Sequence, residues 1–341
     1  MTKSAKYLLI FLSICVLASF SYIFKITNKK TNPEPKVLST YENRQNNKNE
    51  EITFTFAGDA MFGRAVYNQF GKDLTKAFRD FDQNFFSGDI KILNLEGPIT
   101  QQEFVPDTTP ENLVMKFPPQ TASALKWLGI NTVSLANNHT FDQGTSVFNF
   151  TKELLNTNQI TTIGNAKNST NLVQTFEKGS LKISIIGVNV LANTPDLEDE
   201  ISKQKQNGAF VIIFPHWGNE YQATHNSNQE KLAHRWIDQG ADLIIGSHPH
   251  VIQDGEIYKE KPIFYSLGNF LFDQTFSKET QRGLVIKGKI NQNKLTLEII
   301  PLGSLHLRPY ISEGSEKEQI ISQLKKSLGI ETNSPIELDV K

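Results

Sequence analysis

Apolar runs that stop abruptly at polar residues constrain the fold of this chain more than any other feature. The run Ile130 to Leu135 has the pattern of a buried strand, and amides, an imidazole and a carboxylate follow it directly, up to Gly144. Five other runs end in a similar way: Ile52 to Phe56, Ile90 to Leu95, Ala209 to Phe214, Asp242 to Ile245 and Pro262 to Leu267. Open α/β sheets place their binding sites at the carboxyl ends of strands. We therefore expect these ends to converge on one site.

Strand-like and helix-like segments alternate from Glu51 onward. Helical spacing of apolar residues is found over Asp73 to Phe86, Gln120 to Leu128, Thr145 to Asn156 and Asn228 to Gln239. This alternation predicts an α/β domain with an at least partly parallel sheet. Because no linker interrupts the pattern, we expect one domain over residues 51–312. Residues 313–341 are expected to be a C-terminal extension, with a helix and a tail.

The amino-terminal residues 1–27 are predicted to be a short cytoplasmic stub and a membrane anchor. The run Tyr7 to Phe24 carries no charge and is long enough to span a bilayer, and lysines precede it. A cleaved signal peptide is the alternative, because Ser19-Phe20-Ser21 offers a small-x-small cleavage site. Both interpretations place the rest of the chain outside the cytoplasm, and a retained anchor predicts a single-pass cell-membrane protein. Residues 28–50 are polar and contain prolines, which is typical of a flexible linker.

Composition limits the kind of site that the domain can build. The net charge of -1 gives no indication of nucleic-acid binding. The single cysteine, Cys15, lies in the first apolar run, so an intrachain disulfide and a thiolate metal site in the domain are both excluded. A metal would have to be held by His, Asp, Glu or Asn side chains. Such ligands favour a divalent ion of Mn, Fe, Zn or Mg.

The pair His248 and His250 gives the sharpest local signal of metal binding. Residues i and i+2 of an extended backbone face the same side, and Pro249 favours an extended conformation of His248. Two imidazoles just past a buried strand would make half of a metal site. The alternative is a pair of loop histidines with ordinary surface hydrogen bonds.

Other candidate residues also follow strands. Asp59, Glu96 and His216 are candidate ligands, although each alone could be a turn, cap or core residue. The Asn138 amide could ligate a cation without adding charge, and His139 could protonate a leaving oxygen. The Arg64 guanidinium could hold a phosphate or a carboxylate, with an ordinary ion pair as the alternative.

An ordered set of motifs between about Ile52 and Asp273 resembles the CapA family of bacterial capsule proteins, which are associated with poly-γ-glutamate synthesis. The motifs are GDAMFGR from Gly58, NLEGP from Asn94, ANNHTFDQG from Ala136, HWGNEY from His216, GSHPHVIQ from Gly246 and SLGNFLFD from Ser266. The resemblance implies a relation to the calcineurin-like metallophosphoesterases. It therefore implies a four-layer αββα sandwich with metals at the strand ends.

The resemblance also assigns roles. It implies metal ligation by Asp59, Glu96, Asn138, His216, His248 and His250, with Glu96 as the bridging carboxylate and His139 as the catalytic histidine. Met61 stands where the phosphoesterases have a histidine ligand, and a thioether binds hard cations poorly. The site is therefore expected to hold one or two ions, and a second ion would need a ligand from elsewhere, such as Glu220.

Three functions follow as hypotheses. In the first, a membrane-anchored protein acts in poly-γ-glutamate synthesis, export or anchoring through metal-dependent hydrolase or transferase chemistry, together with other capsule-synthesis membrane proteins. In the second, it is an extracytoplasmic metal-dependent phosphoesterase acting on a phosphoester substrate. In the third, the fold is a non-catalytic scaffold that binds an anionic polymer.

Overall fold

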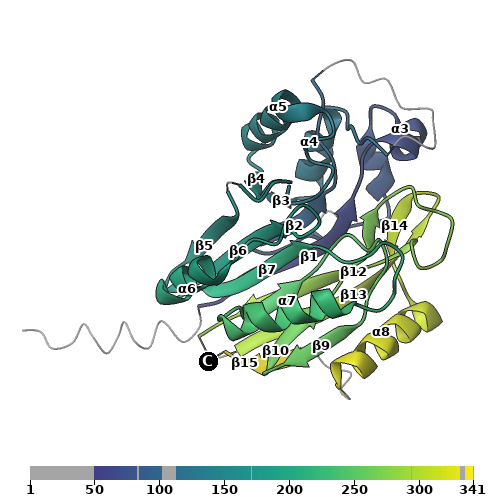
Figure 1. Cartoon of the computed structure of the whole chain (residues 1–341). Coiled ribbons are helices and arrows are strands. Elements are labelled where there is room, and N and C mark those ends of the chain that lie inside the picture. The colour runs from purple at the N-terminus through teal and green to yellow at the C-terminus, as the bar shows by residue number, and fades with distance from the viewer. Residues whose placement is uncertain are drawn as a thin grey trace, which may run out of the picture. The chain divides into compact units, whose positions relative to one another are not determined.

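A computed structural model describes residues 50–82, 84–101, 113–169, 171–292, 294–330 and 335–340. They form a compact unit with two mixed β-sheets, shown in Figure 1. The first sheet has the order β14-β13-β12-β1-β2-β3-β4, with β11 pairing with β1 and β15 with β13. Its strands are β1 (Ile52–Ala60), β2 (Ile90–Leu95), β3 (Thr132–Ser134), β4 (Thr161–Ile163), β11 (Asn269–Leu271), β12 (Arg282–Ile290), β13 (Lys294–Leu305), β14 (Arg308–Ile311) and β15 (Ile336–Asp339).

The second sheet has the order β5-β6-β7-β8-β10-β9. Its strands are β5 (Val173–Lys178), β6 (Leu181–Asn189), β7 (Phe210–His216), β8 (Leu243–Ile245), β9 (Gly255–Tyr258) and β10 (Lys261–Phe264). Strands β6, β7, β8 and β10 run parallel, whereas β5 and β9 are antiparallel edge strands. The predicted mixture of helices and partly parallel sheet is confirmed.

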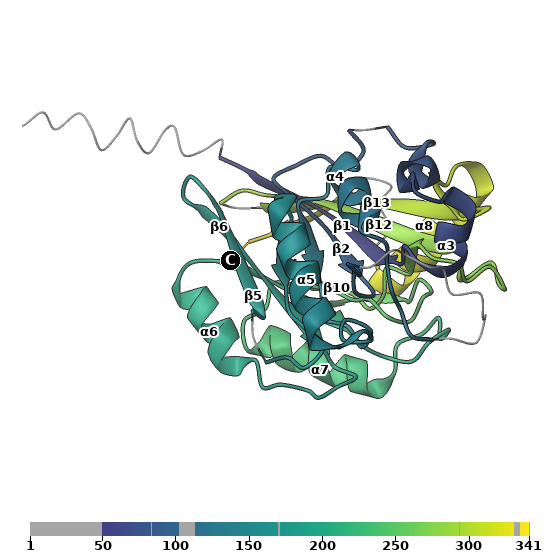
Figure 2. The same cartoon turned by 90° about the horizontal axis from the view of Figure 1, so that it is seen from above.

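Helices cover the outer face of each sheet (Figures 1 and 2). The helices α3 (Arg64–Phe70), η2 (Leu74–Phe78), α4 (Gln120–Trp127) and α5 (Gly144–Thr157) pack on the first sheet, and α6 (Glu198–Gln206) and α7 (Ser227–Asp238) pack on the second. A further helix, α8 (Gly314–Leu328), contacts β9 of one sheet and β13 of the other. Its buried residues Ile320, Leu324 and Leu328 join the core between the sheets.

Strand β7 illustrates why continuous apolar runs form these sheets. Ile212 and Phe214 face the core between the sheets, and Val211 and Ile213 face α6 and α7. Alternate side chains of a strand point to opposite faces, so a strand that is buried on both faces must be apolar throughout. The run therefore stops being apolar only at its carboxyl end, where His216 is found.

Parallel pairing aligns the ends of the central strands of the first sheet. Asp59 of β1 lies opposite Asn94 of β2, and Asn94 lies opposite Ser134 of β3. The register of β1 shifts on both sides of Asp59, so this strand is irregular just where it reaches the site.

Two segments differ from their predicted structure. The helix expected over Asp73 to Phe86 is a short 3-10 helix ending at Phe78, followed by turns. The Asp82 side chain accepts a hydrogen bond from the Asn84 backbone N–H, a local bond that competes with helix formation. The phenylalanines of the segment from Asp73 to Phe86 are nevertheless buried in the core between the first sheet and its helices.

The C-terminal extension contains a helix, α8, and a strand in place of the expected tail. Strand β15 pairs with β13 from Lys294 to Leu297, so these residues complete the first sheet and belong to the same compact unit. The expected anchor and nearly all of the expected linker, residues 1–49, lie outside the described residues. Among the residues that are described, no helix has both the length and the apolar character needed to cross a bilayer.

Gly58 should be required for the register of β1 at the site. A Cβ atom at Gly58 would lie 1.9 Å from the Gly268 carbonyl oxygen, so Gly58→Ala should push β1 away from the Gly268 backbone and cost about 1–3 kcal/mol of unfolding free energy. Gly187→Ala is the matched control, because its Cβ would find its nearest neighbour at 3.1 Å. Denaturant unfolding of both variants checks this, and equal losses would contradict it.

Candidate metal centre

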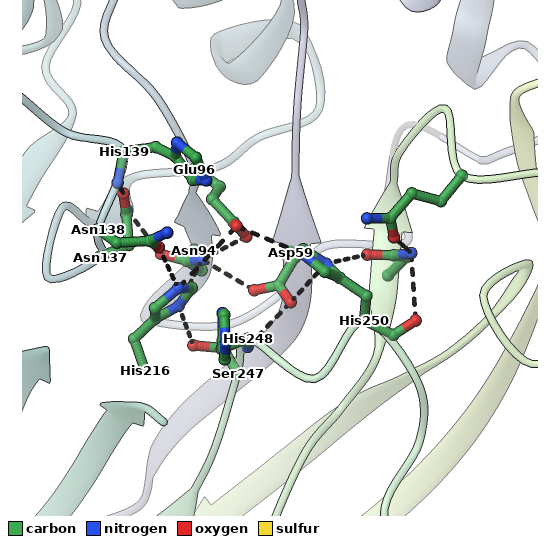
Figure 3. A network of polar contacts seen from close by, with 12 residues as sticks. Asp59, Asn94, Glu96, Asn137, Asn138, His139, His216, Ser247, His248 and His250 are labelled. Atoms are coloured by element: carbon green, nitrogen blue, oxygen red, sulfur yellow. Dashed lines mark hydrogen bonds and ion pairs between the residues drawn. The ribbon is translucent and has the colours of Figure 1, made fainter. Parts of the chain in front are cut away.

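The polar residues that follow the apolar runs meet at one place in the structure, shown in Figure 3. The strand ends that supply them belong to both sheets. Asp59 lies at the end of β1, Glu96 directly after β2, Asn138 and His139 after β3, His216 at the end of β7, and His248 and His250 after β8.

Two buried carboxylates form the middle of the centre, and one amide joins them. The Asn94 Nδ2 atom donates to Asp59 Oδ1 at 2.8 Å and to Glu96 Oε2 at 3.3 Å. The backbone N–H of His248 donates to the second oxygen, Asp59 Oδ2, at 3.0 Å. Asn94 is held in turn by Asn137, whose Nδ2 donates to Asn94 Oδ1 at 3.0 Å.

Burial makes negative charge costly at these two carboxyls. It raises the pKa of Asp59 to about 7, against the lowering effect of the Asn94 and His248 hydrogen bonds. The pKa of Glu96 is raised well above its ordinary value by burial first and then by the charges of Asp59 and Glu220. Two carboxylates so close together hold both charges at neutral pH only if positive charge lies beside them.

Three buried histidines face these carboxylates. Burial is the main cause that lowers the pKa of His248 to about 4 and that of His250 to about 3, and it lowers the pKa of His216 well below its ordinary value. The three imidazoles are therefore neutral at physiological pH, which is the form that ligates metal ions. They do not provide the positive charge that the carboxylates need.

Hydrogen bonds orient two of these imidazoles. His250 Nδ1 lies 3.0 Å from Asn269 Oδ1 and donates to it, which leaves His250 Nε2 facing Glu96 Oε1 at 3.5 Å. His216 Nδ1 lies 3.1 Å from Ser247 Oγ, and its Nε2 lies 2.9 Å from Asn138 Oδ1. In His250 the contact on one ring nitrogen orients the other toward a metal ion, whereas His216 has a side-chain oxygen beside each ring nitrogen.

The centre fits a divalent cation. Two buried atoms, Glu96 Oε1 and His248 Nδ1, have no hydrogen-bond partner among the described residues, and such buried polar atoms are costly. Ligand atoms come within 4.8 Å of one another in the set Glu96, His216 and His248 and in the set Asp59, Glu96 and His250. Imidazole and carboxylate ligands at this spacing suit Zn, Mn or Fe.

The backbone of the histidine pair is not extended. His248 has φ 97 and His250 has φ 57, so the prediction of an extended segment was wrong. Hydrogen bonds hold this conformation, since the His248 N–H donates to Asp59 and the Pro249 carbonyl accepts from the Tyr221 N–H at 2.8 Å. Both imidazoles still reach the centre, because the loop folds around the Asp59 carboxylate.

The rim of the centre carries His139 and Asn138. His139 Nδ1 lies 2.7 Å from Asp142 Oδ2, and the side chains of both residues are mostly buried. The Asp142 carboxylate therefore orients the imidazole. Asn138 is exposed, and its amide oxygen faces His216.

Arg64 and Met61 are engaged elsewhere. The Arg64 guanidinium forms a two-pronged ion pair with Asp273, with Nε 3.0 Å from Oδ2, so much of its charge is compensated. Met61 is buried in the core beneath the first sheet, where its sulfur accepts a hydrogen bond from the Gly63 N–H. The charge of Arg64 nevertheless lowers the pKa of Glu96, so Arg64 still acts on the centre, whereas Met61 lies in the core.

Sequence reasoning missed the residues that support the ligands. Asn94, Asn137, Ser247 and Asn269 hold the carboxylates and imidazoles in place. Asn94 could have been found, because it lies two residues before Glu96 and therefore on the same face of the strand.

In the absence of metal, the Glu96→Gln variant should be more stable than the wild type, and the difference should grow as the pH rises. A raised pKa means that the folded state binds the proton more tightly, so the wild type loses stability as the pH rises above the ordinary carboxyl pKa of 4.5. The variant loses less, because only the Asp59 carboxyl of the pair remains to be ionised. We expect melting several degrees higher for the chelator-treated variant at about pH 8, with a smaller advantage at about pH 5. Added Mn²⁺ should stabilise only the wild type. Equal pH profiles in thermal denaturation would contradict this expectation.

Comparisons with known proteins agree with these observations. The model of the family described as bacterial capsule synthesis protein PGA_cap matches residues 53–274. The capsule biosynthesis protein CapA of Bacillus anthracis is 30% identical over 307 residues, which cover 82% of this chain and 74% of that protein. The PGA biosynthesis protein CapA of Bacillus subtilis is 29% identical over 301 residues, or 81% of this chain and 75% of that protein.

A solved structure of a phosphatase from Mycoplasma pneumoniae aligns with 79% of this chain and 97% of its own, at 15% identity and a TM-score of 0.45. This similarity carries no argument about function. The match of the family model over most of the domain, supported by the two Bacillus relatives, is decisive: the chain belongs to the PGA_cap family of bacterial capsule synthesis proteins.

Proposed function

We propose that this protein acts in the synthesis, export or surface attachment of a poly-γ-glutamate capsule, through a metal-dependent hydrolase or transferase site. The observation that carries the proposal is the buried centre in a member of a capsule family. Among the described residues, Glu96 Oε1 and His248 Nδ1 have no hydrogen-bond partner there, and they lie between carboxylates and neutral imidazoles. Buried polar atoms without hydrogen bonds are costly, and a bound cation would offset that cost here.

The residues can be given roles in this chemistry. Asp59, Glu96, His216, His248 and His250, with Asn138 at the rim, would hold one or two divalent ions. Such an ion supplies Lewis acidity toward a carbonyl or phosphoryl oxygen. His139, whose Nδ1 is held by Asp142, would give a proton from Nε2 to the leaving group.

Exposed aromatic side chains beside the centre fit a polymer substrate. Tyr221 and Phe276 are 44% and 67% exposed, and their rings meet edge to face at 5.2 Å. The Tyr221 ring also lies 6.2 Å from the His250 ring. A γ-glutamyl chain carries methylene groups between its amides, and exposed aromatic rings next to the centre would contact them.

We further propose that the fold is the four-layer αββα sandwich of the metallophosphoesterases. Two facing sheets, with helices on their outer faces and metal-ligating residues at the strand ends, support this assignment. The site would lie outside the cytoplasm, with residues 1–27 as a membrane anchor. The uncharged run before the polar segment supports that localisation.

Loss of the gene in its own host should lower the amount of cell-associated and released poly-γ-glutamate. The wild-type chain should restore the polymer, whereas His250→Ala should not, because it removes a buried ligand candidate. Glu318→Gln, which changes an exposed side chain of α8, is the control and should restore it fully. Normal polymer in the deletion strain would exclude the proposal. Restoration by His250→Ala at normal protein levels would favour a non-catalytic scaffold.

Phosphoester hydrolysis is the second candidate function, favoured by the His139–Asp142 pair at the rim of the centre. If it is correct, the full-length chain with Mn²⁺ should hydrolyse an aryl phosphate. Asp142→Asn should lower kcat by about ten-fold or more, because the imidazole loses the partner that orients it. His250→Ala should abolish the activity. A chain that binds metal and is inactive on several phosphoesters would exclude this function.

A further inference from the structure

Glu220 lies in a loop that is fixed to the loop of the histidine pair. The Trp217 N–H donates to the Ser247 carbonyl at 3.1 Å, and the Tyr221 N–H donates to the Pro249 carbonyl at 2.8 Å. These bonds lie on either side of Glu220 in the sequence. The position of Glu220 is therefore coupled to the positions of His248 and His250.

The Glu220 carboxylate belongs to a third set of close ligand atoms. An oxygen of Glu220 and nitrogens of His248 and His250 all lie within 4.8 Å of one another. Glu220 is exposed, whereas both histidines are buried. His248 is only 5% exposed and its Nδ1 has no hydrogen-bond partner among the described residues, so a buried, unsatisfied group belongs to the same set.

The three ligand sets overlap in a way that separates two ion positions. Glu96, His216 and His248 form one set, and Asp59, Glu96 and His250 form another; only Glu96 is common to both. A carboxylate has two oxygens and can serve two ions, whereas a neutral imidazole offers one lone pair. His248 therefore completes the first position, and His250 belongs to the second.

The position beside His250 has one imidazole and two carboxylates, and few further side chains can join them. Met61, two residues after Asp59, uses its sulfur to accept a hydrogen bond within the core. Arg64 is paired with Asp273. In the part of the chain that the structure describes, Glu220 is the acidic side chain that joins His250 in a ligand set besides Asp59 and Glu96.

We propose that Glu220 is a ligand of a divalent ion on the His250 side of the centre, together with Asp59, Glu96 and His250. This inference rests on the proposed metal centre and adds a residue and an ion preference to it. A set with three carboxylates and one imidazole is rich in hard oxygen ligands and favours Mn²⁺ or Mg²⁺ over Zn²⁺. The other position, with two imidazoles, suits Zn²⁺ better.

The proposal also bears on an anionic substrate. The carboxylates of Asp59 and Glu96 inside the centre and of Glu220 at its exposed side would together repel a polyanion, and one divalent ion would leave their summed charge negative. Two ions would make it positive. Binding at the Glu220 position would therefore determine whether a polymer of carboxylates can approach.

Metal binding by the full-length chain tests this directly. We expect the metal-depleted wild type to take up two Mn²⁺ ions, with the electron paramagnetic resonance spectrum of a coupled pair. Glu220→Gln should take up one ion, with the spectrum of an isolated Mn²⁺, or bind the second about ten-fold or more weakly. Glu220→His should change the metal preference of the position beside His250 toward Zn²⁺. Glu318→Gln is the control and should match the wild type.

Two outcomes separate the inference from the function on which it rests. If Glu220→Gln keeps the stoichiometry, affinity and coupled spectrum of the wild type, Glu220 is not a ligand and the inference is wrong, although the metal centre stands. If the wild type itself binds no divalent ion, the metal centre and the inference both fail. Circular dichroism of each variant checks that a lost ion does not reflect a lost fold.

Discussion

The side-chain amide of Asn94 is the contact on which the candidate centre depends. One nitrogen donates to both Asp59 and Glu96, two buried carboxyls that would otherwise face each other without a shared donor. Its oxygen is held by Asn137, which also accepts from the His139 N–H and so links the carboxylates to the rim. Both sheets contribute to this network, because His216 from the second sheet approaches the same amide at 3.3 Å. The distance between the strand ends is therefore fixed by a hydrogen-bonded network as well as by the packing of the core.

Much of the fold could be predicted because the central strands of both sheets are buried on two faces. The run Ile90 to Leu95 coincides with β2, and the helix predicted from Asn228 to Gln239 differs from α7 by one residue at each end. The phenylalanines between Asp73 and Phe86 misled the prediction. They have helical spacing, but they pack against one another and against Phe270 from a segment made of a short 3-10 helix and turns. The pairing of β15 with β13 could not be predicted, since a short edge strand after a helix has little pattern of its own.

The sequence predicted that the candidate ligands converge, but it could not predict which of them are protonated. Strand ends that carry Asp59, Glu96, His216 and His250 could be expected to meet, because parallel strands share one edge. The neutral imidazoles and the raised carboxyl pKa values arise from burial, which depends on the whole assembled core. The engagement of Arg64 by Asp273 depends on residues 209 positions apart, and no local spacing reveals such a pair.

Both ends of the described domain lie far from the centre. Strand β1 begins at Ile52, which lies opposite Ile290 of β12. Strand β15 ends at Asp339, which lies opposite Lys294 of β13, the strand next to β12. Asp59 lies at the other end of β1, roughly 20–25 Å away at the usual rise per strand residue. A tether, an affinity tag or a fluorescent protein joined directly at either end of the described domain would therefore leave the centre uncovered. The domain could therefore be immobilised at one end without covering the residues of the centre at the other.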